Sequence, residues 1–385
     1  MKFEHPLWQA GFRPFFTFAF VFGSMAPLLW YFLYAGKIQI PPGGLSSVQW
    51  HAHEMFFGFG WAVMGGFLLT ASKNWVSVRG IHGPILALMA VLWLVERFSI
   101  FYLGVLPPQV TWIFSHLFLI SIATYIFWTL YSYRKQDSYR DNFIFLIVLP
   151  LFLVAKDLVL NPSHFSDGVA MTIGLFRVAF VVMFERTLTQ FMKNAFQLHL
   201  YRNFYLDSSI KLLAILLIFE KQLPVHLSVV ALIFIGSLLL LRFCLWKPVQ
   251  AFQNFGISLS YLGYLGLILH FFSQALVLMG FWHPVGSVVI HIFTFLCMGI
   301  VVSAMMLRIS QGHTGRKFTF TKSDRWGISF LFIAAFFRLV ATQIWPSFYE
   351  VWIFFAALGW AFCFASLGFR LIPFLCKARL DGKIH

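Results

Sequence analysis

The stretch VQWHAHEMFFGFGWAVMGGFLLTASKNW, residues 48–75, decides the fold class of this chain. It opens with four side chains that can bind metal ions, His51, His53, Glu54 and Met55. It then stays almost wholly apolar for a length that crosses the hydrocarbon of a membrane, which takes roughly 20 helical residues. The segment therefore predicts a transmembrane helix that carries potential metal ligands where the membrane begins.

The composition extends this prediction to the whole chain of 385 residues. Of these residues 60% are apolar and only 11% are charged, whereas a soluble domain carries about a quarter charged residues. A chain this apolar cannot cover a surface that faces water. We therefore expect a polytopic membrane protein.

The apolar runs follow one another along the entire chain and leave no room for a soluble domain. We expect an all-α protein that forms a single integral-membrane domain over residues 1–385, with about twelve transmembrane helices. The predicted spans lie at roughly 12–34, 48–71, 84–104, 110–131, 143–161, 168–186, 208–221, 225–246, 256–280, 286–309, 325–344 and 348–375.

Most of the 28 Lys and Arg residues fall into alternate loops between these spans. Cytoplasmic loops of membrane proteins are enriched in Lys and Arg, so both termini are predicted to be cytoplasmic. These loops also explain the net charge of +15, and nucleic acid is not expected as a partner. The four cysteines form no CxxC or CxxCH pattern, which argues against a disulfide framework, a zinc ribbon and covalently attached haem.

With this orientation, five histidines lie in the outer half of the membrane: His51, His53, His116, His270 and His291. A polar side chain inside hydrocarbon is costly, so each is a functional candidate. For any one of them, the alternative is a neutral histidine that is hydrogen-bonded to a neighbouring helix. We favour metal ligation for His51, His53, His270 and His291 together because they share a depth, and for His116 both interpretations stay open.

In a regular helix, neighbouring residues project about 100° apart, so His51, Glu54 and Met55 share one face and His53 points nearly to the opposite side. This geometry would serve two adjacent sites, one from His53 and one from His51 with Glu54 or Met55. An extended chain before residue 53 would instead let both imidazoles hold a single ion. Imidazole with a nearby thioether suits copper. The predicted metal ligands are His51, His53, His270, His291, Glu54 and Met55.

Charged residues inside the spans repeat the outer-half pattern and include Arg97 and Arg338. A haem between helices needs one or two axial histidines and cationic partners for its propionates near an interface. Arg97 and Arg338 are suitably placed for the second task. The alternative is plain ion pairing, and the sequence does not separate the two. The predicted cofactor-binding residues are His51, His53, His270, His291, Arg97 and Arg338, and no residue is assigned a catalytic role.

The segment RISQGHTGRKF, residues 308–318, ends the tenth predicted span on the opposite side of the membrane. Gly312 and Gly315 suit a helix C-cap and turn. His313 lies far in depth from the other histidines. We interpret this segment as structural.

Four segments of the chain carry a specific combination of motifs: LWQAGFRPFF (7–16), WHAHEMFFGFGWAVMGGFLLTASKNW (50–75), LWLVER (92–97) and HIFTFLCMG…MMLRISQGHTGR (291–316). In this combination the chain resembles the NnrS family of bacterial membrane proteins over its whole length. It departs from the family pattern in NWVS (74–77) and in FERTLTQFMKNAF (184–196), both on the predicted cytoplasmic side.

The resemblance implies a multi-pass protein of the bacterial inner membrane that binds haem, of the non-covalent b-type, and copper, and that protects against nitric oxide. Its expected partners are nitric oxide or a related small gas, membrane lipid, and quinol or another electron donor. Nitric oxide is uncharged and partitions into lipid, so a buried centre needs no water channel.

Two other functions stay open. One is a catalytic redox enzyme such as a quinol-linked nitric oxide reductase, for which Glu54, Glu96, Lys156 and Asp157 would supply a proton path. The other is a transporter of haem, metal or another solute, because twelve helices with both ends inside is a common carrier plan. The sequence shows no repeated halves and no corresponding pair of broken helices, which weighs against a transporter.

Overall fold

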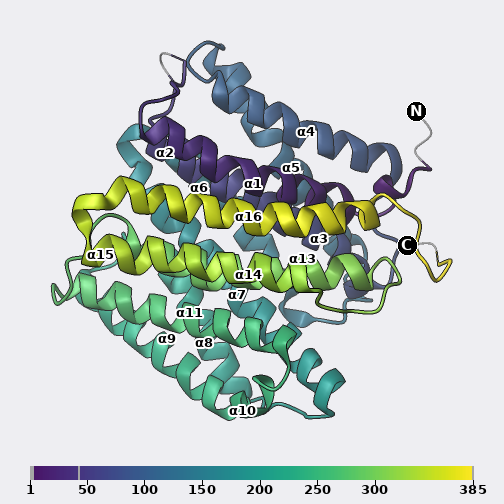
Figure 1. Ribbon diagram of the computed structural model, residues 1–385. Helices are drawn as coiled ribbons and strands as arrows, with labels where there is room; N and C mark the ends of the chain where they lie inside the picture. Colours follow the sequence, from purple (N-terminus) through teal and green to yellow (C-terminus); the bar gives the residue numbers. More distant parts are fainter. Residues whose placement is uncertain (1–3, 42–43, 384–385) are drawn as a thin grey trace. The chain divides into compact units, whose positions relative to one another are not determined.

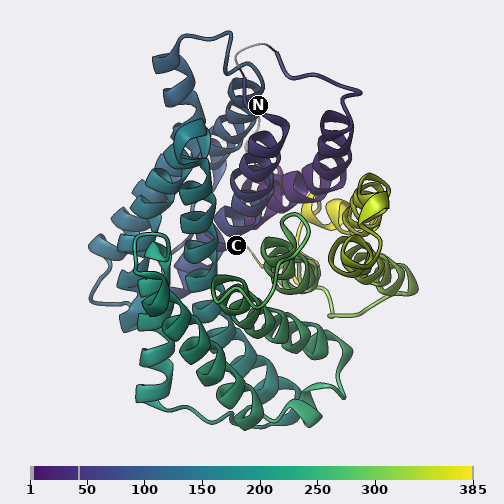
Figure 2. The same ribbon diagram turned by 90° about the vertical axis from the view of Figure 1, so that its left-hand side faces the viewer.

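The computed structural model describes residues 4–41 and 44–383. Within these residues every regular element is a helix and none is a strand (Figure 1). The view turned by 90° shows the same helices joined by loops (Figure 2). The predicted all-α fold is confirmed.

Ten helical segments of the described part are long and apolar enough to cross a membrane, which fits a multi-pass membrane protein. Several of them combine two or three elements, and the letter η marks segments with 3-10 or π geometry. They are α1 (Phe12–Tyr34), α2–η2–α3 (Ser47–His53, Glu54–Gly60, Trp61–Val76), α4 (Gly83–Phe101), α5 (Pro108–Ser132), η4–α7 (Pro162–His164, Phe165–Phe196), α9 (Val225–Leu245), α11 (Phe255–Leu278), α12–η6–α13 (Val288–His291, Ile292–Gly299, Ile300–Gly312), α14–η7–α15 (Lys322–Phe336, Phe337–Ala341, Thr342–Ile344) and η8–α16 (Pro346–Phe348, Tyr349–Leu375).

The two remaining predicted spans form shorter helices. Helix α6 (Ile144–Leu160) has 17 residues and α8 (Phe204–Leu216) has 13. At a rise of 1.5 Å per residue they reach only about 25 and 20 Å, less than the roughly 30 Å of hydrocarbon. The exact count of twelve is therefore not confirmed. The other short elements are η1 (Pro6–Trp8), η3 (Arg140–Phe143), η5 (Leu217–Phe219) and α10 (Pro248–Ala251).

The chain divides into two compact units, which are described separately below. Unit 1 comprises Met1–Gly168, Met306–Gly327 and Ala357–His385. Unit 2 comprises Val169–Met305 and Ile328–Ala356. Helices α7, α13, α14 and α16 contribute residues to both units.

In unit 1, α1 packs against α3 and η2, α4 packs against α5, and α6 packs against α2 and α5. Glycines bring α3 close to its neighbours. A Cβ atom added at Gly65 would lie 2.6 Å from the side chain of Ile122 on α5, and one at Gly66 would lie 3.0 Å from Phe15 on α1. Small residues at such contacts let membrane helices approach closely, which gains van der Waals packing.

In unit 2, α11 packs against α9 and against the π segment η6. Gly263 and Gly266 face η6 and the start of α13. An added Cβ would lie 2.1 Å from Val301 Cγ2 at the first position and 2.7 Å from the carbonyl carbon of Leu296 at the second. The contact of α11 with the element that follows His291 therefore requires glycine.

Replacing Gly266 by Ala is expected to lower the free energy of unfolding by about 1–3 kcal/mol, because overpacking a close backbone contact costs that much. Gly312→Ala is the matched control, since nothing lies within 4 Å of its added Cβ. Thermal unfolding of both purified variants in detergent measures the difference. Equal melting temperatures would contradict the close packing of α11 on η6.

Candidate metal site

The HAHEM segment begins inside a helix whose start is fixed by a capping box. The side chain of Ser46 accepts a hydrogen bond from Gln49 N (3.2 Å), and the side chain of Gln49 accepts one from Ser46 N (3.3 Å). This reciprocal pairing satisfies two backbone donors of the first helical turn. His51 and His53 therefore lie in regular helix α2, and the extended conformation that would let both hold one ion is not adopted.

Three predicted site segments adjoin or contain π-helical backbone. Segment η2 starts at Glu54, η6 starts directly after His291, and η7 contains Arg338. A π-helix, with its i→i+5 hydrogen bonds, is rare in proteins. Where one occurs, it often marks a functional site. The sequence analysis assumed a regular 100° step and did not foresee these segments, so its assignment of faces applies only up to His53.

His53 is fully buried, and its two ring nitrogens differ. Nδ1 lies 2.9 Å from Glu54 Oε1, where the ring N–H donates to the carboxylate. Nε2 then carries the lone pair; it has no hydrogen-bond partner and lies 3.9 Å from Glu96 Oε1. The ring of Phe57 stacks on the imidazole at 5.4 Å. This arrangement leaves one buried lone pair on His53 without a partner.

The other two side chains of the motif lie in less buried positions. His51 is half-buried, and its ring stacks on Trp30 at a centroid distance of 4.0 Å. Met55 is half-buried as well. The carboxylate of Glu54 was predicted on the face of His51, and the structure places it against His53 at the point where regular α-helix ends.

Four charged side chains form a buried cluster beside His53. Arg97 donates to Glu54 Oε2 (2.6 Å) and to Glu96 Oε1, and Lys156 donates to the same Glu96 oxygen and to the carbonyl oxygen of Ser115. The four charges balance, two positive and two negative. A balanced cluster with short ion pairs is the form in which charges are tolerated away from water. For Arg97 the ion-pairing alternative is therefore realised.

His116 forms a second polar contact of unit 1, with the partly exposed side chain of Asp157. Its Nδ1 lies 2.8 Å from Trp112 O, to which the ring N–H donates, and its Nε2 lies 3.1 Å from Asp157 Oδ1. The indole N–H of Trp112 donates to the same Asp157 oxygen (2.9 Å), and the side chain of Asp157 is 49% exposed. Both ring nitrogens of His116 thus lie near oxygen atoms.

In unit 2, His270 is buried and contacts an arginine. Its Nδ1 lies 3.0 Å from Val289 O, to which the ring N–H donates, and Nε2 accepts from Arg177 Nε (3.0 Å) and Nη2 (2.7 Å). Arg177 also donates to Glu220 Oε2 (2.8 Å), and Gln274 donates to Glu220 Oε1 (2.8 Å). The lone pair of His270 is therefore used by the guanidinium group.

His291 and Arg338 of unit 2 share a contact with Ser287. The Nδ1–H of His291 donates to Ser287 O (2.8 Å), and Arg338 donates to the hydroxyl of the same residue (3.1 Å) and to Tyr349 Oη (3.0 Å). Gly286, at φ +64°, lets the loop approach Tyr349, because a Cβ there would lie 2.2 Å from Tyr349 Oη. Arg338 is only 4% exposed, its Nε has no partner, and no carboxylate of the described residues pairs with it.

The predicted site residues thus fall into two sets. Unit 1 holds His51, His53, Glu54, Met55 and Arg97, and unit 2 holds His270, His291 and Arg338. Across residues 4–41 and 44–383, no group of three or more His, Cys, Asp or Glu side chains is arranged to hold a metal ion. The partners Trp30, Glu220 and Ser287 were not predicted, because nothing local in the sequence marks them.

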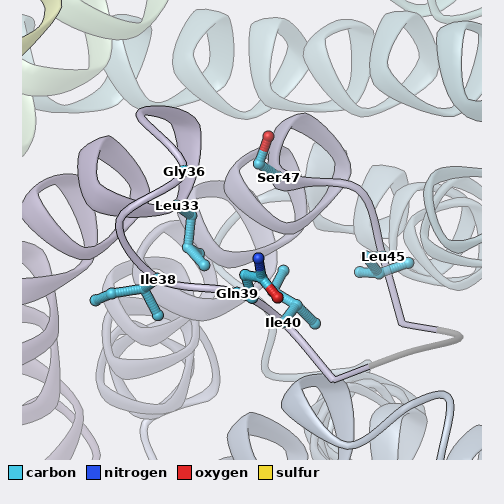
Figure 3. A pocket seen from close by; sticks show the side chains of 7 residues that line it. All are labelled: Leu33, Gly36, Ile38, Gln39, Ile40, Leu45 and Ser47. Carbon is cyan, nitrogen blue, oxygen red and sulfur yellow. The ribbon is translucent and has the colours of Figure 1, made fainter.

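A small hollow lies beside the start of α2 (Figure 3). It has a volume of about 300 Å³ and is lined by Leu33, Gly36, Ile38, Gln39, Ile40, Leu45 and Ser47. The predicted ligand side chains do not line it.

His313 follows α13 and packs its ring against Phe12 of α1 at 5.4 Å. Burial, and then the positive charges of Lys73 and Arg379, lower the pKa of His313 to about 4. This histidine is therefore neutral in the folded protein at pH 7.

A family model with the description NnrS protein matches residues 6–379, nearly the whole chain. A comparison with curated proteins found no match.

Arg97→Gln is expected to cost about 3–5 kcal/mol of folding free energy, because it leaves the buried carboxylate of Glu54 without its cation. Arg338→Gln is the matched control: it removes a buried guanidinium group without leaving a carboxylate unpaired, and we expect a clearly smaller loss. Thermal unfolding in detergent compares the two. An equal loss for both variants would show that the charge cluster does not stabilise unit 1.

Stability is expected to fall as the pH is lowered from about 6.5 to 4. The unfolded chain protonates His313 near its ordinary pKa of about 6.5, whereas the folded chain keeps it neutral down to about pH 4. The unfolded state therefore binds more protons in this window, so acid favours unfolding. Between pH 7 and pH 5 this contribution is about 2 kcal/mol.

His313→Gln removes this contribution, so its unfolding temperature should change less between pH 7 and pH 5 than that of the unmodified protein. His164→Gln serves as the control, because this side chain is 55% exposed. If His313→Gln and His164→Gln showed the same acid sensitivity, the assignment to His313 would be wrong.

Proposed function

Because the chain belongs to the NnrS family, we propose that it is a bacterial inner-membrane protein that holds haem and copper and protects against nitric oxide. The family supplies the cofactors and the gas, and the residues of this chain supply the groups that would bind them. The proposal includes the topology of twelve spans with cytoplasmic termini, which the distribution of Lys and Arg supports.

The state of His53 carries the proposal. A metal-binding histidine usually donates its second ring N–H to a carboxylate or a carbonyl oxygen, which fixes the tautomer and directs the other nitrogen at the metal. His53 has this arrangement with Glu54, and its Nε2 is buried without a partner. An unpartnered buried polar atom costs about 1–3 kcal/mol, and ligation of a metal by Nε2 would offset that cost.

His291 and His270 have the same orientation in weaker form. Each donates its Nδ1–H to a carbonyl oxygen, which places the lone pair on Nε2. In His270 that lone pair accepts from Arg177, so ligation there would require Arg177 to give up two hydrogen bonds. We therefore propose His53 as the principal ligand of unit 1, with His51, Met55, His270 and His291 as further candidates.

The two predicted propionate partners differ in the charge that surrounds them. Arg97 already faces two carboxylates. Arg338 is buried with only the hydroxyl groups of Ser287 and Tyr349 as hydrogen-bond partners. A carboxylate of a bound haem would complete the hydrogen bonding of Arg338 by charge-assisted bonds, which are the stronger kind. We propose Arg338 for this role.

When bound, haem and copper would supply tight binding of nitric oxide and electron exchange. The chain would position them by imidazoles held in one tautomer and would keep water away with aromatic side chains such as Phe57. The gas reaches such a site through lipid, because it carries no charge. This division of tasks fits a protein that captures nitric oxide from the membrane.

Absorption spectra and metal analysis of purified variants test the proposal. His53→Ala is expected to lose at least one of haem and copper while still inserting in the membrane, and His164→Ala, at an exposed position, should keep both. Added imidazole should restore the spectrum of His53→Gly, because it can occupy the space of the lost ring. Full retention of both cofactors by His53→Ala would refute this ligand assignment.

A catalytic redox enzyme is the second candidate, and the buried cluster of Glu96, Lys156 and Arg97 beside His53 favours it, because such groups can serve proton uptake. Steady consumption of nitric oxide by reconstituted protein with a quinol donor would support a reductase. Binding that stops after one equivalent would support protection by capture.

A further inference from the structure

The motif LWQAGFRPFF places an unusual arginine at the start of α1. Arg13 is fully buried, and its Nη1 donates to Leu375 O (2.6 Å) and to Lys377 O (2.8 Å). Its Nε and Nη2 have no hydrogen-bond partner, and no carboxylate of the described residues forms an ion pair with it. The carbonyl groups at the C-terminus of α16 carry only about half a negative charge. Most of the charge of Arg13 is therefore not neutralised.

The surroundings of Arg13 add positive charge. The positive charges of Arg316 and Arg379 both repel that of Arg13, and the charge of Arg379 also repels that of Lys73. One of these cations is paired with a carboxylate: the two carboxylate oxygens of Asp381 accept hydrogen bonds from Arg379 (2.8 and 2.5 Å). Four cations and one carboxylate leave an excess of positive charge around a buried guanidinium group.

Three motifs from distant parts of the sequence build this place. Phe12 N donates to the hydroxyl of Thr70, which precedes the ASKNW segment, at 2.9 Å. Arg379 donates to the carbonyl oxygen of His313 in the QGHTGR segment (3.0 Å), and Leu380 N donates to Thr314 O (3.1 Å). The proposed metal site uses none of these contacts, so the motifs need a separate explanation.

This place lies far from the predicted ligands of unit 1 along the same span. His51 and Lys73 are 22 positions apart in the helical segment Ser47–Val76, which corresponds to roughly 30 Å. A haem held by His53 would not reach Arg13. The excess charge around Arg13 therefore calls for a different anion.

We propose that Arg13, together with Lys73, Arg316 and Arg379, binds the phosphate group of an anionic ligand at this end of unit 1. A guanidinium group presents a planar fork of N–H donors that matches a phosphate, and its bonds to phosphate are charge-assisted. Nε and Nη2 of Arg13 are such an unused fork. A soluble phosphate monoester carries up to two negative charges and the phosphodiester of a phospholipid carries one, and either presents several acceptor oxygens to the surplus of cations. The phosphate belongs to a phospholipid headgroup or to a soluble phosphate compound.

Phosphate binding is tested on the full-length protein in a neutral detergent at constant ionic strength, with thermal unfolding followed as inorganic phosphate is added. Phosphate should raise the unfolding temperature of the unmodified protein. For Arg13→Met the phosphate concentration that gives half of this effect should be about ten- to hundred-fold higher, as expected for lost charge-assisted hydrogen bonds. Arg134→Met, at an exposed arginine of unit 1, should respond like the unmodified protein.

Arg316→Gln is the second variant, because Arg316 is less buried and its loss should weaken phosphate binding several-fold even if Arg13→Met does not fold. A parallel comparison in bilayers of phosphatidylglycerol and of phosphatidylcholine identifies the source. Stabilisation by phosphatidylglycerol over phosphatidylcholine assigns a lipid headgroup, and stabilisation by inorganic phosphate without a difference between the two lipids assigns a soluble compound. The inference is overturned if neither probe stabilises the unmodified protein, or if the variants at Arg13 and Arg316 respond like Arg134→Met.

Discussion

The ion pairs of Glu96 are the interaction on which unit 1 depends. One carboxylate oxygen of Glu96 accepts from Arg97 and from Lys156, and Lys156 also donates to Ser115 O. With the bond from Arg97 to Glu54, this cluster joins η2, α4, α5 and α6. Hydrocarbon offers no water to solvate these groups, so the helices must supply every partner themselves. The same requirement places His53, which abuts this cluster, in a fixed orientation.

The buried arginines of the two units fall into two kinds. Arg97 and Arg177 each form a short ion pair with a glutamate, and their role is explained by the fold. Arg13 and Arg338 donate only to carbonyl or hydroxyl groups, and no carboxylate of the described residues pairs with either. An unpaired buried charge is strongly unfavourable, so native proteins pair it or use it. An anion at each of these two positions, as proposed above, would complete their pairing.

The sequence predicted the spans well where an apolar run ends at a clear signal. The runs 12–34 and 225–246 match Phe12–Tyr34 and Val225–Leu245, because flanking polar residues and Pro224 mark the ends. The sequence analysis underestimated the length of the helix predicted at 168–186. The structure has a helix over Phe165–Phe196, whose last turns are amphipathic and continue past the apolar run. Lys156 and Glu96 are 60 residues apart, and no local pattern shows which charges pair across such a separation.

For the candidate site, the sequence identified the residue types and missed their partners. The prediction relied on a regular helix, and the π segments after His53 and His291 change the faces that follow. Such backbone is less stable than a regular α-helix and persists where packing maintains it, as the glycines of α11 do for η6. His53 Nε2 and Arg338 Nε, the unpartnered atoms of the proposed metal and propionate sites, lie beside or within π segments. Irregular backbone and an unsatisfied buried polar atom each cost folding free energy. A ligand bound at these sites would offset both costs at one place.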